Sequence, residues 1–322
     1  MNKLETILQD HYSVKITNIS PQQGGWAALA YKVSNDKHTY FLKVYEKSRA
    51  STPKWTALID EYMPIMVWLQ HNSGLRGKIP VPLLTKHGDY KCEDEDGVYL
   101  LYEYIDGETI GDKDLTREQA RQLSEIITEL HRYGEEIPGE TAAIKEDFGV
   151  PFVQQLRTTL DKEYNTIPGD VREKIRPYIE QIKDLMDTVD KLSVGLRHSH
   201  LRMAMCHTDI HYWNLMQSGQ QLILIDWEGL RLAPVEADMM FLVDKPYFDE
   251  FIRIYQKIHS DFTIHPDALR FYQGRRKLED IWEWMEQLLY DNQTAEARAN
   301  TLKSLIKELK DLRSQTSYRL HD

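Results

Sequence analysis

The 322-residue chain has 41% apolar and 28% charged residues, the composition of an ordinary globular protein, which excludes the disordered and fibrous classes. Its 40 basic and 51 acidic residues give a formal net charge of −11, which argues against a nucleic-acid partner. The length exceeds the usual size of one hydrophobic core, so we expect one large two-part domain or two domains.

The cysteines and the apolar segments bear on the cellular compartment. Cys92 and Cys206 are the two cysteines of the chain and lie far apart, which favours reduced thiols over a disulfide framework. The first residues lack the apolar core of a signal peptide, and no stretch reaches the ~20 apolar residues of a membrane span. We therefore expect a cytoplasmic protein with no membrane partner and no obligate protein partner.

The first third of the chain has the pattern of a β-rich unit. Alternating and strand-forming residues predict strands over residues 12–19, 29–33, 39–45 and 98–105. Asn35 and Asp36 predict a hairpin between the second and third of these strands. A helix is expected over residues 60–70, with Pro64 fitting only near its first turn.

Helical patterns dominate the rest of the chain. Thr116 and Gln119 form a capping-box pattern, and apolar residues follow at helical spacing. Asp170 begins a second long helical stripe that runs to Leu192, and a third stripe begins at Leu302. The sequence therefore predicts an α+β protein with a small β-sheet lobe and a larger, mostly helical lobe.

Three polar residues of ligand type, Asp209, Asn214 and Asp226, lie within eighteen positions of one another. A turn at Gly219, between two short apolar strands, brings Asn214 back beside Asp226, so that an amide oxygen and a carboxylate can share magnesium ions. Asp209 stays on the preceding loop, where its carboxylate can orient a nucleophile and accept a proton. Phosphoryl transfer needs both functions.

The pattern His207-x-Asp209-x-x-x-x-Asn214, with a trailing Asp226-Trp227, resembles the aminoglycoside phosphotransferase and choline kinase family, a relative of the protein kinases. The resemblance implies a bilobal protein-kinase-like fold and an ATP- and Mg-dependent transfer of phosphate to a small-molecule hydroxyl. It also implies that Asp209 is the catalytic base, that Asn214 and Asp226 bind magnesium, and that His207 organises the loop.

The same resemblance assigns residues to the nucleotide. Lys43 is similar to the lysine that holds the α- and β-phosphates, and Glu61 is the candidate for its ion-pair partner. Glu103 and Ile105 lie in a segment similar to the hinge, whose backbone would bind adenine, and Gly24–Gly25 lies where a phosphate-covering loop belongs. We therefore expect an N-terminal nucleotide-binding lobe over residues 1–104 and a C-terminal catalytic and substrate-binding lobe over residues 105–322.

On the acceptor side, three segments are similar to the spectinomycin phosphotransferases of that family: residues 206–211, 226–234 and 276–289. This similarity implies a cationic small-molecule acceptor, an aminoglycoside or aminocyclitol antibiotic such as spectinomycin. Candidate acceptor contacts are Glu228, Glu279, Asp280 and Trp282. For the last three, a half-buried amphipathic helix is an equally good explanation.

Two further residues near the motif have alternative interpretations. Trp213 departs from the family, which often has glycine before the asparagine, and this change can reshape the acceptor side of the loop. Asp238 either braces the catalytic loop, as a second loop-organising residue, or begins the next helix.

Other functions stay open at the level of sequence. His207, Asp209 and His211 alternate, as three metal ligands of a metallohydrolase would on one strand face, but this interpretation leaves Asn214 and Asp226 unexplained. A metabolic kinase acting on choline, a sugar or homoserine is a second alternative. A nucleotide-binding regulatory pseudokinase is a third, and the retention of the charged motif residues speaks against it.

Overall fold

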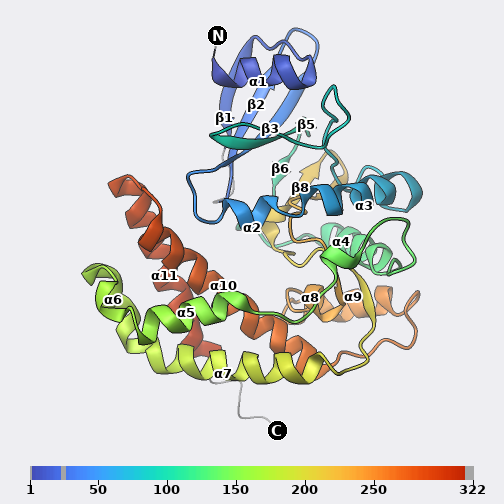
Figure 1. The fold of residues 1–322 in the computed structure, drawn as a ribbon. Coiled ribbons are helices and arrows are strands. Elements are labelled where there is room, and N and C mark those ends of the chain that lie inside the picture. The colour runs from blue at the N-terminus through green and yellow to red at the C-terminus, as the bar shows by residue number, and fades with distance from the viewer. Residues whose placement is uncertain (1, 23–26, 316–322) are drawn as a thin grey trace. The chain divides into compact units, whose positions relative to one another are not determined.

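The structure is a computed structural model that describes residues 2–22 and 27–315, with the side chains of 313–315 left out (Figure 1). The chain divides into two compact units. The first contains the residues up to 48, 52–145 and 202–263, and the second contains 49–51, 146–201 and 264 onward. The lobe boundary predicted between residues 104 and 105 falls inside the first unit and stays a prediction. Gly24 and Gly25 lie outside the described residues.

The first unit contains a five-stranded antiparallel sheet among its described residues. Its strands are β1 (Asn18–Gln22), β2 (Leu29–Ser34), β3 (Thr39–Glu46), β4 (Cys92–Glu93) and β5 (Gly97–Glu103), in the order β1-β2-β3-β5-β4. The predicted hairpin between β2 and β3 is confirmed, because the side-chain oxygen of Asn35 accepts hydrogen bonds from the backbone nitrogens of Lys37 and His38.

The strand predicted over residues 12–19 is wrong over most of its length. Tyr12 ends a helix, α1 (Lys3–Tyr12), and β1 begins only at Asn18. The helix forms because Asn2 and Glu5 make a capping box at its start. Its buried face joins the hydrophobic core of the sheet, which holds it in place (Figure 1).

The helix predicted over residues 60–70 is confirmed as α3 (Ile59–Asn72), which follows the short helix α2 (Thr52–Thr56). Pro64 lies inside α3, beyond its first turn, where proline removes a backbone hydrogen bond. The helix persists because its apolar face is buried; Tyr62 and Ile65, for example, are at most 1% exposed.

The predicted capping box of Thr116 and Gln119 is confirmed at the start of α4 (Arg117–Leu130). The predicted turn at Gly219 is also confirmed; it joins β8 (Leu215–Ser218) to β9 (Gln221–Leu224), and Gly219 has a φ of 55°. The remaining elements of the first unit are β6 (Glu108–Thr109), η1 (Ala142–Ile144), β7 (Met203–Cys206), η4 (Tyr212–Asn214), β10 (Arg231–Pro234), α8 (Glu236–Met239) and α9 (Phe248–Tyr255). β6 pairs with β8, and β7 pairs with β10.

Helices are the regular secondary structure of the second unit in its described residues. Its elements are α5 (Pro151–Asp161), η2 (Tyr164–Thr166), α6 (Gly169–Ile175), η3 (Arg176–Tyr178), α7 (Ile179–Leu196), α10 (Pro266–Tyr290) and α11 (Ala295–Gln315). The single helix predicted from Asp170 to Leu192 is wrong, because the helix is interrupted at η3, which contains Pro177. The predicted helix over Leu302 to Leu312 is part of α11.

The α+β class is confirmed, with an N-terminal antiparallel sheet followed by a mostly helical remainder. Within the described part of the chain, no helix combines the length and the apolar character that crossing a membrane requires.

Candidate active site

The loop between β7 and β8 runs from His207 to Asn214 and contains the motif residues. Thr208 has a φ of 67°, and Asp226, just after β9, has a φ of 64°. Residues other than glycine rarely adopt this left-handed conformation, which costs about 1–3 kcal/mol and persists only where other contacts enforce it. One strained position, Thr208, therefore lies beside the predicted catalytic base Asp209, and the other, Asp226, is a predicted magnesium ligand.

Asp209 and Asn214 are joined by hydrogen bonds. The side-chain nitrogen of Asn214 donates to the carbonyl oxygen of Asp209 at 2.9 Å and to its Oδ2 at 3.0 Å. The carbonyl oxygen of Asn214 accepts from the backbone nitrogen of Ile225 at 2.9 Å, which sets Asn214 beside the residue preceding Asp226. The structure thus brings together the three residues that the sequence pattern singles out.

These residues fit the magnesium ligands that the family resemblance implies. The Asn214 amide nitrogen is engaged by Asp209, and its Oδ1 accepts no hydrogen bond from any described residue. The Asp226 side chain is 39% exposed, so its carboxylate is accessible. An amide oxygen and a carboxylate are the hard oxygen ligands that magnesium prefers.

Lys43, on β3, reaches the same hairpin. Its Nζ lies 3.0 Å from Oδ1 of Asp226 and 2.5 Å from Oε1 of Glu228, and the Tyr45 hydroxyl donates to the same oxygen of Glu228. Burial alone would lower the pKa of Lys43, yet the charges of Asp226 and Glu228 raise it well above its ordinary value. Lys43 is therefore a largely buried cation, with its side chain 13% exposed, held by two carboxylates.

In the described structure Lys43 pairs with Asp226 and Glu228, and the predicted ion pair between Lys43 and Glu61 stays a prediction. Glu61 lies in the first turn of α3, half-buried, and it makes no ion pair with Lys43 in the described structure. α3 buries the neighbouring residue, Tyr62, whose hydroxyl has no hydrogen-bond partner among the described residues. Glu228, predicted to contact the acceptor, takes the place of Glu61, and its side chain is only 9% exposed.

His207 is fully buried and ties the loop together. Its Nε2 lies 2.9 Å from the carbonyl oxygen of Ile225, and its Nδ1 accepts from the backbone nitrogen of Asp209 at 3.2 Å. Its ring also packs edge-on against Trp227, with the centroids 4.6 Å apart. Both ring nitrogens are thus occupied, which argues against the metallohydrolase alternative, where His207 would be a ligand.

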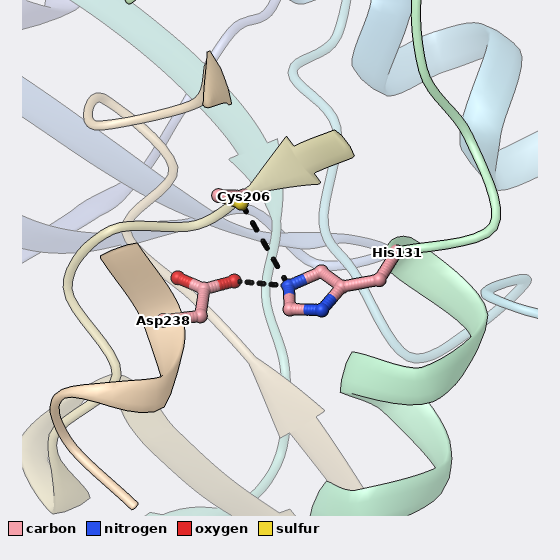
Figure 2. Close-up of side chains that lie close together, drawn as sticks. All are labelled: His131, Cys206 and Asp238. Atoms are coloured by element: carbon pink, nitrogen blue, oxygen red, sulfur yellow. Dashed lines mark hydrogen bonds and ion pairs between the residues drawn. The ribbon is translucent and has the colours of Figure 1, made fainter. Parts of the chain in front are cut away.

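Figure 2 shows three buried side chains that lie close together: His131 at the end of α4, Cys206 at the end of β7 and Asp238 in α8. Their ligand-type atoms all lie within 4.8 Å of one another. His131 Nε2 is 2.9 Å from Asp238 Oδ2, the other ring nitrogen is 3.0 Å from the Tyr255 hydroxyl, and the thiol donates to two carbonyl oxygens at the end of β10. These distances describe a hydrogen-bonded network, in which no metal is needed.

Asp238 connects this network to the loop. Its carboxylate accepts from the backbone nitrogen of His207 at 3.0 Å and from that of Thr208 at 2.6 Å. Thr208 also donates its hydroxyl to the carbonyl oxygen of Gly229 at 2.8 Å. A Cβ on Gly229 would lie 2.5 Å from the Thr208 hydroxyl, so the loop requires a glycine there. His131 and Gly229 were not singled out from the sequence.

The remaining predicted residues lie elsewhere. Glu103 ends β5, and Ile105 follows it where the chain leaves the sheet. Glu279, Asp280 and Trp282 lie on α10, in the second unit. Burial raises the pKa of Asp280 to about 6, although Arg276, 2.8 Å away, opposes the shift. Trp282 is only 5% exposed, as the amphipathic-helix interpretation requires.

One comparison with known proteins shows the family of this chain. The family model described as the phosphotransferase enzyme family matches residues 18–272, more than half of the chain. A search of curated proteins found no match.

Among solved structures, the chain is similar to spectinomycin phosphotransferase in complex with ADP and spectinomycin, at 22% identity and a TM-score of 0.72, covering 97% of this chain and 98% of that one. It is also similar to a microcompartment-associated aminopropanol kinase, at 12% identity and a TM-score of 0.62, covering 98% and 97% of the two chains. A choline kinase from Streptococcus pneumoniae gives 16% identity and a TM-score of 0.60, covering 96% and 98%. At these identities the likeness establishes the fold.

Replacing Asp238 by alanine is predicted to lower the free energy of unfolding by about 3 to 5 kcal/mol, because two buried backbone N–H groups and His131 lose their acceptor. Asp238→Asn keeps one acceptor oxygen and should lose less. Chemical denaturation of the three proteins measures the difference. A loss of under about 1 kcal/mol for Asp238→Ala would mean that the carboxylate does not hold the loop.

Proposed function

The chain belongs to the phosphotransferase enzyme family, and we propose that it transfers the γ-phosphoryl group of ATP, with magnesium, to a hydroxyl group of a small molecule. The observation that carries this proposal is the position of Lys43, a largely buried cation on β3. Its ammonium group lies 3.0 Å from Asp226, and the backbone pairs Asn214 with Ile225, the residue before Asp226. Phosphoryl transfer is catalysed almost entirely by such positioning and electrostatic stabilisation.

Asp209 is proposed to be the catalytic base. The Asn214 amide orients its carboxylate, and His211 Nε2 lies 3.4 Å from its Oδ2. The side chain is 28% exposed, so an acceptor hydroxyl can reach it. In this position Asp209 orients the hydroxyl for in-line attack and accepts its proton, while the new bond to the γ-phosphorus forms and the bond from that phosphorus to the bridging oxygen breaks, which releases ADP.

The nucleotide is proposed to bind where Lys43 faces Asp226. Lys43 contacts its phosphates, while Asn214 and Asp226 hold magnesium, which neutralises the phosphate charge when bound. Glu228 accepts a hydrogen bond from the ammonium group of Lys43, and the Tyr45 hydroxyl donates to the same oxygen of Glu228. These contacts are proposed to hold Lys43 in place of a carboxylate from α3. The backbone near Glu103 and Ile105 is proposed to bind adenine, in line with a nucleotide-binding lobe over residues 1–104 and an acceptor-binding lobe over 105–322.

The proposed acceptor is a cationic aminoglycoside or aminocyclitol, with spectinomycin as the first candidate and Glu279 and Asp280 as contacts. The structural likeness to spectinomycin phosphotransferase and the net charge of −11 support this choice, since an acidic protein attracts a cationic substrate. The second candidate is a metabolic kinase of a small amino alcohol, supported by the likeness to aminopropanol kinase and choline kinase. Both candidates place the protein in the cytoplasm, where ATP is available.

Transfer from radiolabelled ATP with magnesium to a panel of aminoglycosides, spectinomycin, choline and simple sugars tests the function. We expect label on one class of acceptor, and Asp209→Asn should lower kcat at least about 100-fold, because the amide cannot accept the proton. ATP affinity should be unchanged in the variant. Full turnover by Asp209→Asn would show that Asp209 is not the catalytic base. If no acceptor of the panel is labelled, a pseudokinase would be the better explanation.

A second pair of variants distinguishes the two candidate partners of Lys43. Glu228→Gln is expected to raise the KM for ATP about tenfold, equivalent to ~1.4 kcal/mol, because the ammonium group loses a charged partner at 2.5 Å. Glu61→Gln, the matched control, should leave the KM unchanged. Steady-state kinetics with varied ATP separates the two outcomes, and an effect confined to Glu61→Gln would reverse the assignment.

A further inference from the structure

Trp213 is one of the exposed large apolar side chains of the described residues, and it lies on the proposed catalytic loop. Its side chain is 46% exposed, although most large apolar side chains of the described residues are buried. It lies in η4, directly before Asn214 and four residues after Asp209. A single exposed apolar side chain is ordinary on a protein surface. Its place between a proposed magnesium ligand and the proposed base is what makes Trp213 a candidate for contact with the acceptor.

The indole ring of Trp213 packs against the backbone of Gly111. A Cβ at Gly111 would lie 3.2 to 3.3 Å from Cη2, Cζ2 and Cζ3 of Trp213, and the φ of Gly111 is +63°. The backbone nitrogen of Gly111 also donates to the carbonyl oxygen of Tyr212 at 3.1 Å. One edge of the ring therefore packs against the backbone of Gly111, while 46% of the side chain stays exposed. A fixed aromatic surface binds a ligand at low entropic cost.

The neighbouring aromatic residue, Tyr212, already has a cationic partner within the protein. Lys245 Nζ lies 4.8 Å from the ring centroid of Tyr212, a cation–π contact within the protein. Trp213 has no aromatic or cationic partner of this kind in the described part of the chain. The loop thus presents one flat aromatic wall. An ammonium cage for choline needs several rings around the cation, whereas a single wall fits the flat apolar face of a ring.

We propose that Trp213 determines acceptor specificity, and that a saturated ring, a sugar or a cyclitol, packs against its indole face while one ring hydroxyl reaches Asp209. This inference rests on the proposed kinase function and narrows its substrate class to ring-bearing acceptors, against short acyclic amino alcohols. Trp213 takes no part in the transfer of the phosphoryl group or of the proton.

The test compares Trp213→Ala and Trp213→Phe with the wild type, using spectinomycin and an aminoglycoside as ring acceptors and choline and aminopropanol as acyclic ones. For the ring acceptor that the wild type phosphorylates, Trp213→Ala should raise the acceptor KM at least about tenfold, with kcat within about threefold. The KM for ATP should not change, and Trp213→Phe should restore most of the acceptor affinity. Ile258→Ala, which removes a 53% exposed apolar side chain from the same unit, is the control and should have no effect.

Each other outcome overturns the inference in a distinguishable way. An unchanged acceptor KM in Trp213→Ala would remove Trp213 from acceptor recognition and leave the kinase intact. An equal rise in the KM for ATP, or a loss of thermal stability, would assign Trp213 to loop structure instead. Phosphorylation of acyclic acceptors alone would support the proposed kinase function but contradict the proposal that the acceptor has a ring packed against Trp213. No phosphorylation of any acceptor would reject the proposed function itself.

Discussion

The site depends on the hydrogen bonds between the buried carboxylate of Asp238 and the backbone of the catalytic loop. This carboxylate accepts hydrogen bonds from two consecutive backbone nitrogens, those of His207 and Thr208, and a third contact ties it to His131. Thr208 is in a strained left-handed conformation, and a strained backbone persists only where its surroundings enforce it. Asp238 supplies that enforcement, and the position of Asp209, the next residue, follows from it.

The second constraint joins the sheet to the loop. Lys43 is carried by the central part of the sheet, and its two carboxylate partners, Asp226 and Glu228, follow β9. A charge removed from water is costly without a partner, so the largely buried charges of Lys43 and Glu228 stabilise each other, with Asp226 as the more exposed member of the group. Among the described residues, Lys43 is therefore held without a carboxylate from α3. On α3, Tyr62 is buried and only 1% exposed.

The parts of the site that were predictable from sequence depend on local signals. The turn at Gly219 returns the chain within a few residues, so the proximity of Asn214 to Asp226 follows from short-range geometry. The capping box at Thr116 is likewise a signal four residues long. The same signal at Asn2 and Glu5 was available for α1 and was missed, because the alternation after Tyr12 favoured a strand.

The parts that were not predictable depend on tertiary packing. His131 contacts Asp238 across 107 positions of sequence, and no local pattern links the two. Whether Glu61 or Tyr62 faces Lys43 depends on how α3 rotates against the sheet, and a rotation of one residue changes the answer. The interruption of the long helix at Pro177 had a visible cause, yet the apolar stripe continued through it and concealed the break.

The central claim is that Lys43, Asn214 and Asp226 form a magnesium-dependent nucleotide site. Isothermal titration calorimetry with ATP, in the presence of magnesium and then of a chelator, tests it most directly. The account predicts binding that weakens at least about tenfold when magnesium is removed, and that loses this dependence in Asp226→Ala. Absence of ATP binding, or binding with the same magnesium dependence in Asp226→Ala, would contradict it.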